Sequence, residues 1–482
     1  HLEPMGFIKF DILGLASLRM LEGAIERILR RHHGVAKPTF ADIKEYYDKN
    51  LHPEVIDLED KDVWQNIFHK GKWAGIFQFT EAGAQSFCKN ARPDNIIDLA
   101  AITSIYRPGP LSANVDKKYI GAKEEPEDID YVNDIVRNVT EETYGFLIFQ
   151  EQIAMLAHKL GKDLSLDEGN KLRKLLTKKG TGAASAEKDK IFDKFRRGCV
   201  EKGMKDYEAR ELWETFEYFS GYGFNKSHAV SYCVLSYQCA YLLNYYPSEW
   251  LAAFLDKEPE TRKERAIATA KSLGYNVEPL NVNTSGVNWE ISEDGKTLIQ
   301  PLSSIKGLGE KAIEQVVKHR PFNTIEEFLF HDKVVYSKLN KKALDVLVRS
   351  EALDDLMDDR FLCNVHDEEG NVIDQQLGRR LFWKCVAGER PRKVESLEEN
   401  IENFKGGWEE PVKKTEEMVS YKPFYSNEER IQNLIELTGL YPFHLVILNK
   451  DVKRLEEIQV PPLSEFDPQL RAAWFIVREK IV

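Results

Sequence analysis

The sequence lacks the cysteine pattern of a zinc site or a disulfide framework. It has six cysteines among 482 residues, and none of them forms a C-x-x-C pair. Cysteines scattered in this way are typical of thiols in a reducing compartment, so we expect no structural zinc, no disulfides and a cytoplasmic protein. The six are Cys88, Cys199, Cys233, Cys239, Cys363 and Cys385.

Long apolar runs, targeting signals, repeats and low-complexity tracts are missing as well. No hydrophobic stretch approaches the length of a membrane-spanning helix, so we expect no membrane partner. The chain starts with His-Leu-Glu-Pro-Met, which is neither a signal peptide nor an initiator methionine. We therefore expect it to begin inside a longer protein.

The chain has no overall excess of positive charge, because its formal net charge is -12. A hydrophobic fraction of 42% and a charged fraction of 30% fit a globular chain of several domains. A nucleic-acid enzyme nevertheless needs only a local basic surface. Residues 171–197 provide ten Lys or Arg against three Asp or Glu. The run predicts phosphate contact, and the alternative is a solvated helix face.

The stretch Gly221–His228 reads GYGFNKSH and precedes an apolar, helix-periodic segment. Its two glycines let the backbone bend and approach a ligand closely. Asn225 or Ser227 is predicted to cap the following helix. A helix start with free N–H groups, with Lys226 and His228 nearby and Tyr222 as a flat face, would suit a phosphate and a base. The alternative is a capped loop before a core helix.

Residues 221–229, GYGFNKSHA, resemble the fingers of bacterial replicative DNA polymerases of the C family, the DNA polymerase III alpha subunits. Other stretches match the same family in the same order, and the chain is identified as a member over nearly its whole length. These stretches are KFDILGL at 9–15, YRPGP at 106–110, QEQ at 150–152 and LRKLLTKK at 172–179.

KFDILGL is similar to the palm segment that carries the third catalytic aspartate of this family. The resemblance implies that Asp11 is a metal ligand at a site for two Mg²⁺ ions and that Lys9 lies beside the triphosphate. Taken alone, an Asp in a strand is usually structural. The first two aspartates would lie upstream, in a palm and PHP segment that this chain lacks, so we expect the isolated chain not to extend a primer.

The resemblance also implies a nucleotide-binding set on the fingers. Arg107 lies in a Pro-Gly turn that would hold it rigidly, although it could instead pair with Asp94 or Asp98. Two positions depart from the family: Phe149 replaces a tyrosine, and Lys174 replaces an arginine. The implied nucleotide-binding residues are Arg107, Gln150, Arg173, Lys174, Lys178, Lys179, Tyr222, Asn225, Lys226, Ser227 and His228.

Residues 302–320 predict a helix, a tight Gly307-Leu-Gly309 turn and a second helix, which resembles a helix-hairpin-helix. Such glycines expose N–H groups at a helix start, where they hold a DNA phosphate without reading bases. Lys306 and Lys311 add positive charge. The alternative is a packed helical hairpin with no ligand. Residues 339–353 predict a second hairpin.

Other segments give local expectations. Residues 7–13, 73–80 and 472–478 are predicted as strands, and 121–142 as a polar surface loop. The polar zone from 358 to 428 is where the family often carries a sliding-clamp peptide. The nearest candidate in that zone is Gln376 with Leu381 and Phe382, which are poorly spaced for such a peptide.

Together these features predict an α/β, mostly α-helical chain. The predicted domains are the end of the palm (1–25), the fingers (26–255), a tandem helix-hairpin-helix region (256–360), a polar connector with clamp-binding region (361–470) and the start of an OB domain (471–482). The implied function is part of a DNA-directed DNA polymerase. Its expected partners are primer-template DNA, deoxynucleoside triphosphates, the missing palm segment, a sliding clamp and other replisome subunits. The alternative is a non-catalytic DNA-binding module that keeps the fingers fold.

Overall fold

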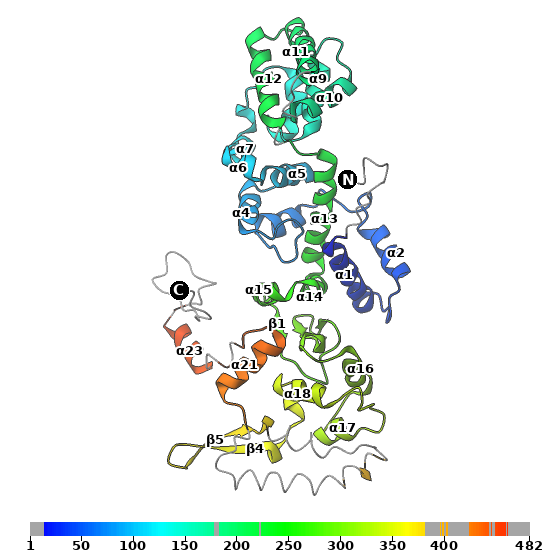
Figure 1. The fold of residues 1–482 in the computed structure, drawn as a ribbon, viewed down its shortest axis with the longest axis vertical. Coiled ribbons are helices and arrows are strands. Elements are labelled where there is room, and N and C mark those ends of the chain that lie inside the picture. The colour runs from blue at the N-terminus through cyan, green and yellow to red at the C-terminus, as the bar shows by residue number, and fades with distance from the viewer. Residues whose placement is uncertain are drawn as a thin grey trace. The chain divides into compact units, whose positions relative to one another are not determined.

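The structure is a computed structural model that describes residues 14–177, 183–220, 223–380, 424–442 and 449–458, with isolated residues at 396, 398–399, 402, 445 and 460. The described chain is mostly helical with two small sheets, which confirms the predicted fold class (Figure 1). It divides into two compact units, His1–Lys257 and Glu258–Val482. The strands predicted at 7–13 and 472–478 lie outside the described residues.

The first unit is organised around α13 (Lys226–Tyr245), a helix of 20 residues. Asn225 caps its N-terminus, and a buried face that includes Cys233 and Tyr237 holds it in the core. It packs against α5 (Ile96–Ile105), α14 (Pro247–Lys257) and α1 (Ala16–His32), as Figure 1 shows.

Ion pairs join α1 to α14 beside this core. Arg27 pairs with Asp256, and both side chains are less than a tenth exposed. Glu249, which is buried, accepts hydrogen bonds from Arg31 at 2.9 Å and contacts His32 at 3.1 Å. Buried carboxylates need such partners because a lone buried charge is costly. Helix α2 (Phe40–Asn50) follows and packs on α1.

The segment 73–80 is a series of turns, so the predicted strand is wrong. It follows α3 (Lys61–Val63) and the π-helical turn η2 (Trp64–His69), and it leads into α4 (Ala82–Ala91). Gly75 and Gln78 have φ of +70° and +71°, which no extended strand allows. The turns direct apolar residues of this segment toward the core. The ring of Trp73 stacks on that of buried Phe79, with 5.2 Å between the ring centres.

The region 121–142 is largely helical, which contradicts the predicted loop. Helix α6 (Pro108–Ser112) leads to α7 (Val115–Glu124), and α8 (Asp134–Thr140) follows. Tyr119 of α7, just before this region, and Val136 of α8 are buried, so a few apolar residues are enough to dock both helices on the core.

Helices α9 to α12 form the remaining part of the first unit. They share a core with Val136 and Val139 of α8, in which Phe195 and Phe216 are fully buried. The predicted helix 206–220 is confirmed as α12. The bounds are α9 (Gln150–Leu160), α10 (Leu166–Thr177), α11 (Ala183–Glu201) and α12 (Asp206–Ser220).

Gly198 lets α11 cross the end of α9 closely, and we expect Gly198→Ala to destabilise this core. A Cβ atom there would overlap the backbone of Leu160, Gly161 and Lys162, which cannot move aside as a side chain can. Overpacking of this kind costs about 1–3 kcal/mol. The urea midpoint of the full chain should fall accordingly.

Gly121→Ala is the matched control for that substitution. Gly121 also lies in a helix, α7, but nothing lies within 4 Å of a Cβ placed there. Alanine should therefore leave stability unchanged or raise it by up to about 1 kcal/mol. An equal loss of stability in both variants would contradict the close-crossing explanation.

The second unit begins with α15 (Glu260–Ser272) and a small sheet. Strand β3 (Thr297–Ile299) lies between β1 (Asn276–Glu278), which is parallel to it, and β2 (Glu290–Ile291), which is antiparallel. Next come α16 (Glu310–His319), α17 (Ile325–Phe330) and α18 (Lys341–Arg349), and α21 (Asn427–Thr438) packs on α18. One apolar core joins these helices, with Phe328 and Leu347 fully buried.

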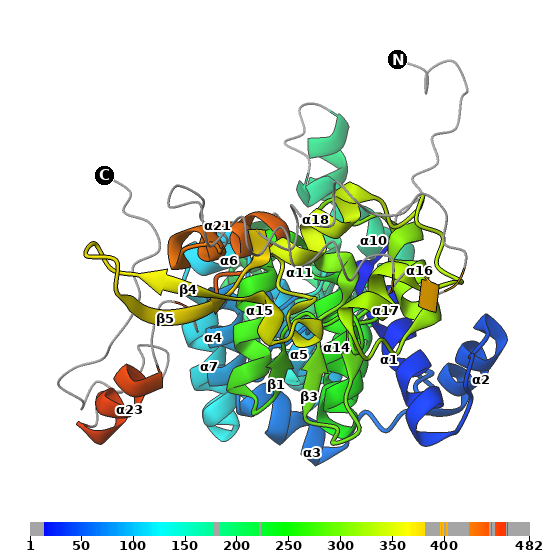
Figure 2. The same ribbon diagram turned by 90° about the horizontal axis from the view of Figure 1, so that it is seen from below.

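Strands β4 (Leu362–His366) and β5 (Val372–Leu377) form an antiparallel hairpin, which Figure 2 shows as a two-stranded ribbon. Gln376 of the predicted clamp peptide pairs with Cys363 in this hairpin, whereas Leu381 and Phe382 lie outside the described residues. Helix α23 (Asn449–Glu457) completes the described elements. The 3-10 turns are η3 (Pro126–Asp128), η4 (Glu141–Thr143), η5 (Leu302–Ser304), η6 (Asp354–Leu356) and η7 (Asp359–Phe361).

Among the described helices, none combines the length and the hydrophobicity that a membrane span requires. The buried thiols of Cys88, Cys199, Cys233 and Cys239 are not joined in disulfides, and Cys385 lies outside the described part of the chain. Burial raises the pKa of Cys233 to about 12, so that thiol stays protonated at neutral pH.

Candidate functional site

The start of α13 lies where two distant chain segments meet. Phe224 donates its backbone N–H to the carbonyl of Ile148 at 3.0 Å, and Gln150 donates its N–H to the carbonyl of Phe224 at 2.9 Å. The side chain of Gln150 also donates to the Gly223 carbonyl, at 2.8 Å. This parallel bridge fixes the loop before α13 against the start of α9. The predicted nucleotide ligand Gln150 thus has a structural role at the same place.

Asn225 caps α13, as predicted. Its Oδ1 accepts the N–H of His228 and the hydroxyl of Ser227, both at 2.8 Å. Ser227 therefore lies in the first helical turn and supports the cap. The two residues form a local polar network whose shape depends on the Asn225 side chain.

An internal carboxylate occupies the N-terminus of α13, where the sequence predicted free N–H groups. Glu151 accepts the backbone N–H of Lys226 at 2.9 Å and the side-chain amide of Asn225 at 2.7 Å. A carboxylate is stabilised at this position by the partial positive charge of the helix start. The prediction of wholly free N–H groups is therefore wrong, because Glu151 of the Gln-Glu-Gln motif reaches across from α9.

The side chain of Lys226 forms an ion pair with Glu142. Its Nζ lies 2.7 Å from both carboxylate oxygens. The pair is partly exposed, with 30% of the Lys226 side chain and 36% of the Glu142 side chain accessible. A solvent-accessible pair of this kind is held weakly, so the ammonium can exchange its partner for another anion.

Arg107 is the N-cap residue of α6, and the prolines after it lie in this short helix where a rigid loop was predicted. The guanidinium donates to the Ser104 carbonyl at 3.0 Å and lies 4.7 Å from the centre of the Phe224 ring. Burial lowers the pKa of Arg107, although a guanidinium remains charged at neutral pH. It therefore places a partly desolvated cation beside the start of α13.

The carboxylates that were considered as partners of Arg107 have another partner. Lys123 donates to Asp98 at 2.6 Å and to Asp94 at 2.9 Å. Tyr144 also donates to Asp98, at 3.1 Å. Lys123 therefore neutralises both carboxylates that were considered as partners of Arg107.

Several predicted site residues lie outside the described part of the chain. Helix α10 contains Arg173 and Lys174, but only its backbone is described at these positions. Within the described residues, no group of three or more His, Cys, Asp or Glu side chains could hold a metal ion. The predicted residues outside the description are Lys9, Asp11, Lys178, Lys179 and Tyr222.

Both glycines of the Gly307-Leu-Gly309 turn are exposed in the second unit, whereas Leu308 is buried in the core. Gly307 has φ of +88°, a conformation that favours glycine, and Gly309 is the N-cap of α16. Within the described residues, the N–H groups of Gly309 and Glu310 have no protein acceptor. Lys306 and Lys311 are also exposed, and the Lys306 N–H bonds to Leu437 of α21. The segment before the turn is the single 3-10 turn η5, so the predicted first helix is wrong. The backbone becomes extended at Ile305, with φ of -81° and ψ of 110°.

Lys342 is a residue of this site that the sequence reasoning missed. A Cβ atom built on Gly307 would lie 3.4 Å from its Cε. Residues 308–312, Leu-Gly-Glu-Lys-Ala, recur as Leu-Asn-Lys-Lys-Ala at 339–343, and the two capping residues are Gly309 and Asn340. Comparison of these two segments would have placed Lys342 in the position of Lys311.

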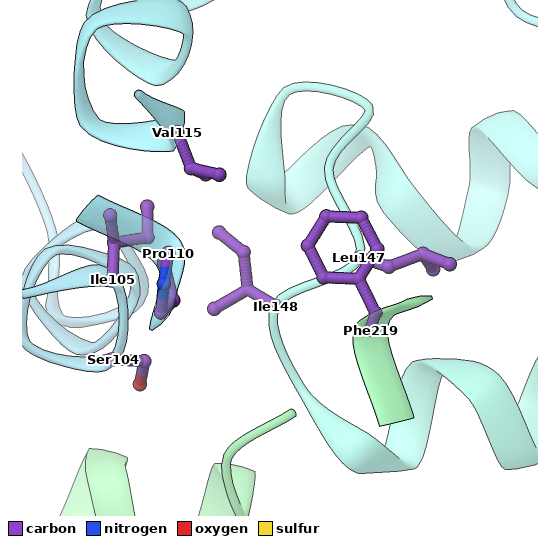
Figure 3. Close-up of a pocket in the computed structure, with 7 residues that line it drawn as sticks. All are labelled: Ser104, Ile105, Pro110, Val115, Leu147, Ile148 and Phe219. Carbon is purple, nitrogen blue, oxygen red and sulfur yellow. The ribbon is translucent and has the colours of Figure 1, made fainter. Parts of the chain in front are cut away.

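A small recess in the first unit lies beside the segment that precedes α9. Figure 3 shows Ile148 of that segment between Pro110 and Phe219. Its volume is about 10 Å³, room for a single water molecule. All of its lining residues but one are apolar, so it is a packing gap and no substrate pocket. They are Ser104, Ile105, Pro110, Val115, Leu147, Ile148 and Phe219.

Comparison with known families finds two matching segments. A family model described as the bacterial DNA polymerase III alpha subunit finger domain matches residues 34–199. A helix-hairpin-helix motif matches residues 274–361. The first segment contains Arg107 and Gln150, and the second contains the Gly307-Leu-Gly309 turn.

Curated proteins named DNA polymerase III subunit alpha are similar over 73% of the chain. Those of Xylella fastidiosa (strain Temecula1 / ATCC 700964), Aquifex aeolicus (strain VF5) and Thermus aquaticus are 32%, 32% and 33% identical over 361, 359 and 363 residues. The aligned part is 28–29% of their own length, so the chain spans less than a third of these relatives. With its finger-domain and helix-hairpin-helix segments in the predicted order, the chain belongs to the family of bacterial DNA polymerase III alpha subunits.

Proposed function

We propose that this chain supplies the nucleotide-binding fingers and a duplex-binding module of a replicative DNA-directed DNA polymerase, which adds deoxynucleotides to a primer 3′ end. The observation that carries the proposal is the partly buried guanidinium of Arg107 beside the start of α13. This cation and the polar residues of Asn225–His228 come from two separate segments and meet at one place. Primer-template DNA and deoxynucleoside triphosphates are the proposed ligands.

Arg107 and Lys226 are the proposed triphosphate contacts within the described residues. Arg107 is held by Ser104 and Phe224, so little conformational entropy is lost when it binds an oxyanion. Lys226 would exchange Glu142 for a phosphate. Arg173 and Lys174 of α10, with Lys178 and Lys179 after it, are further proposed triphosphate contacts.

The palm chemistry rests on residues outside the described part of the chain. Asp11 would bind Mg²⁺ together with aspartates that are not in this sequence, and Lys9 would face the triphosphate. When bound, divalent metal ions activate the attacking 3′ hydroxyl and stabilise charge on the leaving pyrophosphate. The fingers contribute the part of the reaction that this chain's own residues can perform, namely binding and orienting the nucleotide.

The helix-hairpin-helix module is the proposed site for the DNA duplex. The unpaired N–H groups at the start of α16 face solvent together with Lys306, Lys311 and Lys342. Backbone donors and lysines hold phosphate oxygens whatever the base sequence. Binding should therefore lack sequence preference and weaken steeply with salt. A sliding clamp and other replisome subunits are further proposed partners.

Gly309→Val is expected to weaken duplex binding about tenfold without disturbing the fold. Gly309 has φ of -74° and ψ of 151°, which valine adopts without strain, and nothing lies within 4 Å of a Cβ there. The new side chain would block the close approach of a phosphate to the helix start, at the cost of about one charged hydrogen bond. Fluorescence anisotropy with a labelled duplex measures the change.

Lys311→Ala tests the same site by its salt dependence. Loss of one phosphate contact should lower the slope of log affinity against log salt by about 1. Lys318→Ala, at the far end of the same helix, is the matched control and should leave that slope unchanged. Unchanged duplex affinity in Gly309→Val, or equal slopes in the two lysine variants, would show that the turn is a packed hairpin without a ligand.

A further inference from the structure

A line of aromatic rings runs from Arg107 along α13. The distance between ring centres is 5.5 Å for Phe224 and His228, 4.1 Å for His228 and Tyr232, and 5.2 Å for Tyr232 and Phe77. His228 and Tyr232 are four residues apart in α13, so they lie on one face of the helix. Phe224 precedes the helix, in the bridge to Phe149, and its ring contacts that of His228. We call Phe77, Phe224, His228 and Tyr232 the aromatic line.

This face is separate from the core face of α13. His228 is exposed and the other three rings are half-buried, whereas Tyr237 on the core face is fully buried and donates to the Asp57 carbonyl at 2.7 Å. Phe77 is held at the end of the line by its backbone carbonyl, which accepts the Ser236 hydroxyl at 2.9 Å. The rings are therefore positioned by the fold while part of their surface remains open to solvent.

The surrounding charge favours an anionic ligand. Residues 218–248 contain no Asp or Glu, although the chain has 79 of them in 482 residues. The guanidinium of Arg107 stands over the Phe224 end of the line. The carboxylates of Glu142 and Glu151 approach at the start of α13 only, where they bind Lys226 and Asn225.

We propose that the aromatic line binds unpaired nucleotides of a DNA strand, with their bases stacked against the rings. Aromatic side chains beside a cation are the usual platform for single-stranded nucleic acid, because every base has a face that stacks. Several successive rings suit several successive bases, whereas one free nucleotide needs one ring. The identity of the strand as DNA rests on the proposed polymerase function.

The test measures how tightly the full chain binds a labelled thymidine oligonucleotide of about twelve nucleotides, a length that such sites accommodate. Tyr232→Ala and Phe77→Ala are each expected to weaken binding about tenfold, since each removes one stacking surface. Tyr232→Phe keeps the ring and should bind within about twofold of the unchanged chain. Duplex affinity, which depends on the Gly307-Leu-Gly309 turn, should stay the same in all three variants.

Tyr207→Ala is the matched control, because Tyr207 is 54% exposed on α12, away from the line. Thermal unfolding of each variant shows whether weaker binding comes from a lost stacking surface or from a destabilised fold. Tyr232→Phe keeps the packing of the ring. No binding of the oligonucleotide by the unchanged chain would overturn the proposal. So would wild-type affinity in folded Tyr232→Ala and Phe77→Ala, or an equal loss in Tyr207→Ala. Nucleotide incorporation is measured separately, so its failure would count against the proposed function alone.

Discussion

Replacing Asp11 by Asn in the active polymerase is expected to lower the maximum rate of nucleotide incorporation by about a thousandfold or more. An amide keeps the size of the side chain but removes the negative charge that a divalent cation needs in its ligands. Because Asp11 is proposed to serve the chemical step, affinity for the nucleotide and for primer-template DNA should change only modestly. Rapid-quench measurement of a single turnover gives the rate and the affinity separately.

Asp48→Asn is the control for this substitution. Asp48 lies on the exposed face of α2, where it pairs with Lys44, and its loss should leave the incorporation rate unchanged. If Asp11→Asn retains a rate within tenfold of the unchanged enzyme, Asp11 is a structural residue of its segment and the resemblance to the palm motif is misleading at this position.

Arg107→Ala is expected to weaken nucleotide binding about tenfold to a hundredfold, the value of one charged hydrogen bond to a phosphate at about 1.5–3 kcal/mol. Two features of the structure make this loss large for a single side chain. The guanidinium is partly desolvated, which strengthens its attraction for an anion, and Ser104 and Phe224 already hold it in place. The maximum incorporation rate and the affinity for primer-template DNA should stay nearly unchanged.

Arg107→Lys separates charge from geometry at the same position. Lysine keeps the positive charge but cannot bind two phosphate oxygens in parallel, so its nucleotide affinity should lie between those of arginine and alanine. Arg137→Ala is the matched control, because Arg137 is 61% exposed, pairs with Glu141 at 3.8 Å and lies 5.9 Å from the centre of the Tyr131 ring. It should leave nucleotide affinity unchanged. Thermal unfolding of Arg107→Ala checks that Phe224 has not lost its support.

The helices of this chain could largely be predicted from its sequence, because their signals are local. The cap at Asn225 and the helix 206–220 depend on residues that lie within one or two turns of each other. The segment 73–80 could not be predicted in this way. Its alternation of apolar residues suggests a strand, but the positive φ of Gly75 and Gln78 makes it a set of turns whose side chains are buried by partners elsewhere in the chain.

The site shows the same division between local and distant causes. Residues of the loop before α13 could be singled out because glycines, a cap and polar side chains lie together in the sequence. The partners of Lys226 could not be predicted from the sequence, because Glu142 and Glu151 lie more than seventy residues away in the chain. Lys342 was within reach, because the two helix-hairpin-helix segments repeat the same pattern and a direct alignment of them would have revealed it.

The most direct test of the fingers as the nucleotide-binding part of a polymerase is one experiment: single-turnover incorporation at varied nucleotide concentration by the active polymerase with Arg107→Ala and with Asp11→Asn. Arg107→Ala should raise the apparent dissociation constant of the nucleotide and preserve the maximum rate, and Asp11→Asn should do the reverse. An unchanged nucleotide dissociation constant in folded Arg107→Ala would contradict the proposal and give this guanidinium a structural role beside Ser104 and Phe224.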